Sequence, residues 1–275
     1  MIAFLRRSPL SLVGLILIAL LIIGSVGAPL LTPYSPIAVN VRSRLQPPSP
    51  QHPLGTDSFG RDVYSRVLYG GRSTLLIGVL VIVLAVALGV PMGIWSGVAG
   101  ARTDNVIMRV VDAWLAFPAL VLAILLATIL GPSLQNAMLA VALVYIPQFA
   151  RVARGQALSV RSMPYIEAAE AAGAGRFRLM TYHVFPNSVS PIIVQATLAV
   201  GAAILATASL GFLGLGAQPP SPEWGADVAA ATQSLREAPW AAISPGVAIL
   251  LSVIGFNLIG DGLVEWLNPR TRRTS

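Results

Sequence analysis

The chain has 275 residues, of which 55% are hydrophobic and 11% charged, and its mean hydropathy is +0.76. This composition excludes an ordinary soluble domain and indicates an integral membrane protein, whose spans are helical because no alternating pattern of the barrel type occurs. The net charge of +7 comes from arginine without any lysine, and most of it lies in segments predicted to be cytoplasmic, so it indicates membrane topology and not nucleic-acid binding.

Six predicted spans follow from long apolar stretches without ionisable residues, each about 20 residues long. They cover residues 10–31, 75–98, 107–130, 134–150, 191–215 and 241–264. Pro118 should kink the third span, and Pro191 suits the first turn of the fifth. We therefore predict one all-α membrane domain over residues 1–275, with an outer segment at 32–74 and a cytoplasmic loop at 151–190.

The first span has a second interpretation as a cleaved signal peptide, because Arg6 and Arg7 precede an apolar run that ends in small residues. The length of the run and Pro29 directly after Ala28 favour a retained anchor. With the N-terminus inside, twelve of the eighteen arginines lie in cytoplasmic segments, among them Arg270, Arg272 and Arg273. We expect a multi-pass protein of the bacterial cytoplasmic membrane with both termini in the cytoplasm.

The residue types present exclude several kinds of catalytic site. A P-loop needs a lysine to reach the nucleotide phosphates, and this chain has none. Neither Gly-x-Ser-x-Gly nor His-Glu-x-x-His occurs, and without cysteine there is no thiolate metal site. His52 and His183 fall on opposite predicted sides of the membrane. We therefore predict a non-catalytic chain that holds neither a metal nor a cofactor.

The outer segment contains charged residues at short intervals, namely Asp57, Arg61, Asp62 and Arg66. This spacing predicts a short helix with ion pairs between successive turns. Such a helix either folds the loop or contacts another protein at the outer surface. Trp224 follows a proline-rich stretch of the last outer loop, where it either anchors at the membrane interface or meets the same protein.

The most polar part of the predicted cytoplasmic loop runs from Tyr165 to Gly173. Pro164 fits a first helical turn, the two acidic residues complement the helix dipole, and the glycines at 173 and 175 end the helix. A second short helix is predicted over residues 176–185, ended by Pro186. One face of the first helix is small and apolar, so it either caps the bundle or enters a groove of another protein; this face comprises Tyr165, Ala168, Ala169 and Ala172.

The loop resembles the coupling motif of permease subunits of ATP-binding cassette (ABC) importers, Glu-Ala-Ala-x3-Gly-x9-Ile-x-Leu-Pro. Its first part matches at Glu167 and Gly173, whereas His183 and Phe185 replace the Ile and Leu before Pro186. Other stretches resemble the C-type permease of the dipeptide and oligopeptide subfamily, including 52–63, 69–75, 212–216, 219–225, 260–263 and 268–270. The resemblance implies a six-helix type I importer permease.

This resemblance also implies partners. These are a homologous second permease subunit in a heterodimer, one or two ABC ATPase subunits that bind ATP and Mg²⁺, and an extracytoplasmic substrate-binding protein. The outer-surface residues that would contact this binding protein are Asp57, Arg61, Asp62 and Trp224. It implies that the ATPase-coupling residues are Tyr165, Glu167, Ala168, Ala169, Glu170, Ala172, Gly173 and Pro186. The substrate would be a di- or oligopeptide, with nickel, glutathione or haem-like ligands as alternatives. A self-sufficient carrier or channel is the alternative from another class, although neither a mid-membrane charge nor a repeat supports it.

Overall fold

The computed structural model describes residues 9–267 of the protein. Within these residues the chain is helical, apart from loops and one isolated antiparallel β-bridge between Thr56 and Asp62. The arginines at positions 6, 7, 270, 272 and 273, and the motif residues 268–270, lie outside the described residues. The predicted orientation of the termini therefore stays a prediction.

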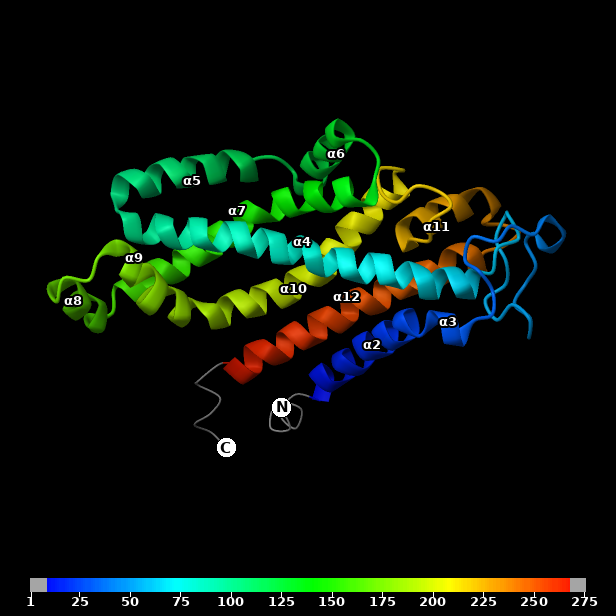
Figure 1. Ribbon diagram of the computed structural model, residues 1–275, viewed down its shortest axis with the longest axis horizontal. Coiled ribbons are helices and arrows are strands. Elements are labelled where there is room, and N and C mark those ends of the chain that lie inside the picture. The colour runs from blue at the N-terminus through cyan, green and yellow to red at the C-terminus, as the bar shows by residue number, and fades with distance from the viewer. Residues whose placement is uncertain (1–8, 268–275) are drawn as a thin grey trace.

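Figure 1 shows an elongated bundle in which the helices run roughly along the long axis. The α-helices are α2 (Pro9–Val26), α3 (Ala28–Leu31), α4 (Val63–Ala99), α5 (Ala101–Leu115), α6 (Ala119–Leu130), α7 (Leu134–Arg161), α8 (Pro164–Ala171), α9 (Arg176–Arg178), α10 (Phe185–Phe212), α11 (Trp224–Ala231) and α12 (Trp240–Leu267). Two 3-10 turns, η1 (Val41–Ser43) and η3 (Thr232–Ser234), and a π-helix, η2 (Leu179–Val184), complete the secondary structure. We call the two extremities the α8 end and the α11 end.

Within residues 9–267, five helices are long and apolar enough to cross a membrane: α2, α4, α7, the combined helix 176–212 and α12. The predicted third span, 107–130, falls on α5 and α6, which meet at a bend of 88°. Pro118 explains the break, because proline has no N–H and disfavours helical backbone at Phe117. This pair is either a sixth, broken span or a re-entrant segment.

Helix α4 begins twelve residues before the predicted second span, at Val63 instead of Leu75. Asp62 caps it, since its carboxylate accepts a hydrogen bond from the Ser65 N–H at 2.7 Å. The early turns carry Arg66 and Arg72, which the sequence assigned to the outer segment and not to the span. Both are bonded to other segments of the protein, so the helix extends beyond the apolar stretch.

The prediction of a short helix ended by Pro186 is wrong. Helices α9, η2 and α10 follow one another without a break, and both Pro186 and Pro191 lie inside the resulting helical run. At the end of η2 the Phe185 N–H bonds five residues back, to the Met180 carbonyl. A π-turn shifts the hydrogen-bond ladder by one residue, and this is one way for a helix to pass a proline.

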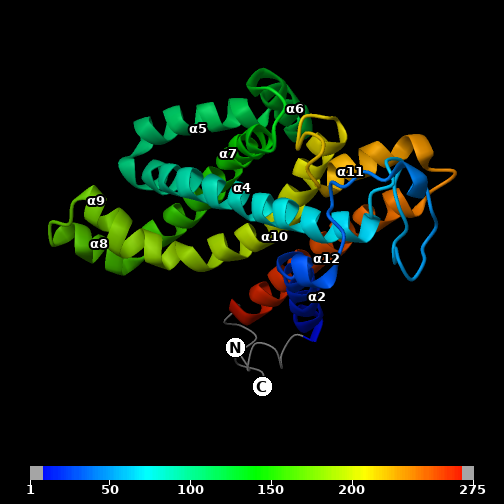
Figure 2. The same cartoon turned by 45° about the vertical axis from the view of Figure 1, so that its right-hand side comes forward.

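The core of the bundle is the long contact between α4 and α7, with α10 packed beside both. Glycines bring the two backbones together. A Cβ atom on Gly89 would lie 2.5 Å from the Ile146 carbonyl oxygen, and one on Gly93 would collide with the backbone of Ala150. Small residues of this kind let membrane helices approach closely. Helices α2 and α12 cross in the same way at Gly14 and Gly255, on the lower side of Figures 1 and 2.

The α4–α7 contact predicts a position-specific effect of alanine. Gly93→Ala should lower the free energy of unfolding by about 1–3 kcal/mol, because the added methyl has no room against the backbone of α7. Gly155→Ala on α7 is the matched control, since nothing lies within 4 Å of a Cβ there. Thermal unfolding of the purified variants in detergent measures both. Equal midpoints for the two variants would contradict the close contact.

Candidate functional site

Helix α8 forms where the sequence predicts it. Met163 is extended, Pro164 occupies the first turn, and Glu167 lies near the positive end of the helix dipole. Ile166 anchors the helix, because its side chain is 1% exposed and belongs to the main core of the bundle. The helix is therefore held at the α8 end of the molecule by one buried side chain.

A tight turn ends α8 and fixes the direction of the chain that follows. Gly173 has φ +85°, its N–H donates to the Glu170 carbonyl at 2.9 Å, and the Ala174 N–H donates to the Ala169 carbonyl at 3.0 Å. These two bonds make a Schellman motif, in which the residue after the helix needs left-handed backbone. Glycine adopts this conformation without strain, which explains the glycine of the motif.

The outward face of α8 is polar and small. The exposed residues of α8 and of the turn that follows it are Pro164, Tyr165, Glu167, Ala168, Glu170, Ala171, Ala172 and Gly173. Ala169, which the sequence placed on the same face, is half-buried and packs with Ala174 against the core. This contact joins the last turn of α8 to the residue after Gly173, as is usual for a Schellman motif.

Exposed aromatic side chains lie on the helices that follow α8, and the sequence analysis did not predict their exposure. Phe177 on α9 is 70% exposed and Tyr182 on η2 is 75% exposed, and Phe185 also faces outward. The ring centroids of Tyr165 and His183 lie 6.4 Å apart, so η2 extends the surface of α8. Pro186 is exposed at the start of α10. The sequence signal that could have revealed this surface is the presence of aromatic residues in a polar loop close to the motif.

At the opposite end, the charged residues of the outer segment fold the segment onto α4. Asp57 accepts hydrogen bonds from the backbone of Phe59 and Arg61 and from the Arg61 Nε atom at 2.6 Å. Asp62 caps α4 and also lies 2.8 Å from the His52 Nδ1 atom. The predicted ion pair between residues four apart is present, but it lies in a turn, because the helix begins only after Asp62.

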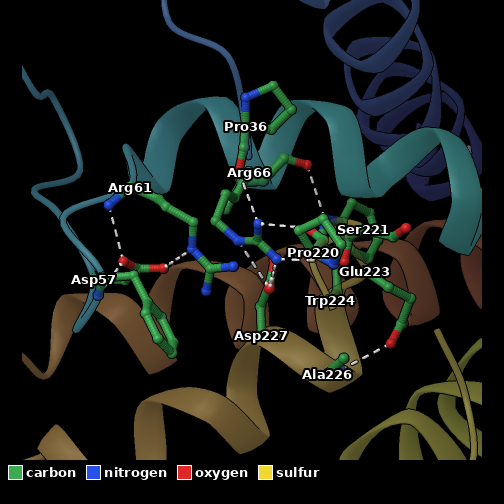
Figure 3. Close-up of polar contacts among 12 residues, drawn as sticks. Pro36, Asp57, Arg61, Arg66, Pro220, Ser221, Glu223, Trp224, Ala226 and Asp227 are labelled. Carbon is green, nitrogen blue, oxygen red and sulfur yellow. Dashed lines mark hydrogen bonds and ion pairs between the residues drawn. The ribbon is translucent and has the colours of Figure 1, made fainter. Parts of the chain in front are cut away.

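Among the described residues, Arg66 and Asp227 form the most buried ion pair. Figure 3 shows the guanidinium group of Arg66 against Asp227 of α11, to which it donates two hydrogen bonds. It also donates to the carbonyl oxygens of Pro36, Pro220 and Ser221. One side chain therefore ties α4, the outer segment and the last outer loop together.

Trp224 is buried beside this pair. Its side chain is 1% exposed, and its indole N–H donates to the Val67 carbonyl of α4 at 2.8 Å. Glu223 caps α11, since its carboxylate accepts from the N–H groups of Gly225 and Ala226. The sequence analysis considered an interface anchor and a partner contact for this tryptophan, whereas the structure places it in the core.

The four residues considered for contact with a binding protein, Asp57, Arg61, Asp62 and Trp224, are all buried. Their bonds stay within the chain, so these side chains offer little surface to a partner. The reason is that charged groups spaced along the outer segment bond to its own turns and to α4. Contact between a binding protein and the α11 end stays a prediction, and it would involve the exposed residues around these four.

Burial changes the proton affinity of the two carboxylates on α11. Loss of hydration raises the pKa of Asp227 to about 6, against the attraction of Arg66, and raises the pKa of Glu223 despite its two backbone donors. Because its pKa is higher in the folded protein, folding favours the protonated form of Asp227. The contribution of this protonation to the free energy of unfolding is present in acid and is lost as the pH rises through about 6.

Residues 89–273 match the family described as binding-protein-dependent transport system inner membrane component. The chain belongs to this family. Residues 2–48 also match the N-terminal transmembrane domain of oligopeptide transport permease C. A family that depends on a binding protein does not favour the alternative of a self-sufficient carrier.

Curated relatives cover almost the whole chain. The probable D,D-dipeptide transport system permease protein DdpC of Escherichia coli K12 is 47% identical over 97% of this chain and 89% of its own length. The dipeptide transport system permease protein DppC of Alkalihalophilus pseudofirmus is 46% identical over 98% of this chain and 88% of its own. DppC of Escherichia coli K12 is 44% identical over 98% and 92%.

A solved structure has the same fold. An inward-facing conformation of the MetNI methionine ABC transporter covers 74% of this chain and 96% of its own, with a TM-score of 0.60 at 17% identity. The fold of this family member is therefore that of a type I ABC importer permease, an integral membrane protein with several spans.

The Schellman turn predicts that Gly173→Ala distorts the end of α8, because left-handed backbone costs a residue with a Cβ atom about 1–2 kcal/mol. Gly175→Ala is the control, since Gly175 has φ −70° and open space around it. Hydrogen exchange of the Ala174 amide should accelerate in the first variant and not in the second. Unchanged exchange in both variants would show that this turn does not hold the loop.

Proposed function

We propose that the chain is the membrane-spanning subunit of an ATP-driven importer of di- and oligopeptides and forms half of the translocation pathway. Its relatives carry dipeptide transport in their names, at 44–47% identity over nearly the whole chain. The chain itself performs no chemistry and leaves ATP and Mg²⁺ to partner subunits. Its task is to convert the movement of those subunits into alternating access.

Coupling to an ATPase takes place at α8. The observation that carries this step is an exposed helix anchored by Ile166 and closed by a rigid turn at Gly173. It lies between α7 and the helical run of α9, η2 and α10, two of the longest elements of the bundle. A force on α8 therefore reaches both. The coupling surface comprises Tyr165, Glu167, Ala168, Glu170 and Ala172, with Gly173 and Pro186 at its edges. Ala169 is half-buried and packs against the core.

The other partners follow from the same proposal. A homologous permease supplies the second half of the pathway, one or two ABC ATPases dock at the α8 end, and an extracytoplasmic substrate-binding protein delivers peptide at the α11 end. This arrangement places the α8 end and both termini in the cytoplasm of a bacterial cell. The arginine bias of the predicted inner segments supports this orientation.

A charge reversal on α8 tests the docking step. Glu167 is exposed and makes no hydrogen bond or ion pair within the described residues, so Glu167→Arg should leave the fold intact. We expect this variant to reach the membrane but to lose the ATPase in co-purification, with coupled ATP hydrolysis reduced about tenfold or more, as expected when a charge is reversed within an interface.

The control is Glu237→Arg, which makes the same charge change at an exposed position of the α11 end. It should retain the ATPase. If Glu167→Arg retains the ATPase as well as the control does, α8 is not the docking helix.

A further inference from the structure

An apolar cavity of about 380 Å³ lies between α4, α5 and α7. Its walls include Met92 of α4, Val111 and Trp114 of α5, and Ile146 and Pro147 of α7. The volume falls in the range of small-molecule sites, roughly 300–1,000 Å³. The cavity belongs neither to the coupling surface nor to the buried ion pairs of the α11 end.

An exposed ion pair joins α5 and α7 within one helical turn of the residues that line this cavity. The Arg151 Nη2 atom lies 2.6 Å from the Asp112 Oδ1 atom, and the side chains are 56% and 63% exposed. Asp112 follows the wall residue Val111 directly, and Arg151 lies one helical turn beyond Pro147 on α7. Arg151 directly follows the predicted fourth span, 134–150, and Asp112 lies five residues into the third, 107–130, so the pair lies near the predicted cytoplasmic boundary of the membrane.

A charged pair at this boundary faces water or a protein partner and not lipid, because an ionised side chain exposed to hydrocarbon costs several kcal/mol. The neighbouring pair shows the difference between a structural contact and an open one. Arg154 donates two hydrogen bonds to Asp104, at 2.5 and 2.6 Å, and the Ser96 hydroxyl group also bonds to that carboxylate. That pair is fully engaged in joining α4, α5 and α7.

The Asp112–Arg151 pair makes few interactions. It has one hydrogen bond, and neither side chain makes another among the described residues. Exposed ion pairs contribute about 0.2–1 kcal/mol, so exchange for another charged partner costs little. A carboxylate oxygen and several guanidinium N–H groups thus remain available at the edge of an apolar cavity.

We propose that this edge is a transit site for zwitterionic short peptides. The peptide ammonium group binds Asp112, the peptide carboxylate binds Arg151, and one peptide side chain enters the apolar cavity. The ends of a dipeptide are about 7 Å apart, so the two residues separate by changing side-chain conformation when the peptide binds. The inference rests on the proposed function, since it requires peptide as the transported substrate.

The test is photolabelling of the purified complete transporter with a dipeptide that carries a diazirine side chain. Mass spectrometry should locate the adducts on Met92, Trp114 or Ile146. Arg151→Gln should reduce labelling by the free dipeptide about tenfold or more, the loss expected for one charge-assisted hydrogen bond. The same substitution should leave labelling by the C-terminally amidated dipeptide unchanged. Asp112→Asn should behave in the same way towards the N-acetylated dipeptide.

This comparison separates binding from folding, because a merely structural pair would lower labelling by every peptide. Arg102→Gln removes an exposed charge on α5, the helix that carries Asp112; it is the control and should change nothing. Adducts elsewhere, or equal losses for free and blocked peptides, would overturn the inference. Uptake of the free dipeptide by the wild-type transporter is measured in parallel. If uptake occurs without cavity labelling, only the transit site fails, whereas absence of uptake contradicts the proposed function itself.

Discussion

The close contact of α4 with α7 is the constraint on which the other features depend. Gly89 and Gly93 allow the two backbones to touch, and α10 packs against the pair that results. Because α4 runs nearly the length of the bundle, it fixes both extremities at once. Its first turns hold the outer segment and α11 through Arg66, and its last residues contact the part of α7 that leads to α8. Distant surfaces are therefore parts of one body.

The two ends of this body use polar residues in opposite ways. At the α11 end, Arg66 and Asp227 are buried and bonded internally, and their hydrogen bonds hold the outer segment and α11 against α4. At the α8 end, Glu167 and Glu170 are exposed and the aromatic residues around them are uncovered. A buried ion pair is costly to break, whereas an exposed polar helix is free to bind. This difference is what we expect if the α8 end carries the coupling interface.

Local sequence signals predicted local structure well. Pro164 and Gly173 mark the limits of α8, because a first-turn proline and a left-handed glycine are properties of single positions. These signals failed where contacts between residues far apart in the sequence determine the extent of a helix. Arg66 extends α4 by bonding to Asp227, 161 residues away, which no spacing rule reveals. The helical run through Pro186 depends on the π-turn of η2, and proline alone predicts a break.

Direct contact between α8 and an ATPase is the central claim, and cross-linking measures it most directly. The natural chain contains no cysteine, so Ala168→Cys introduces a single reactive thiol on the exposed face of α8. In the assembled transporter a short thiol-reactive cross-linker should join this position to the ATPase, and Arg236→Cys at the α11 end should give no such product. Failure of Ala168→Cys to cross-link in a transporter that remains active, or equal cross-linking from both positions, would contradict the account.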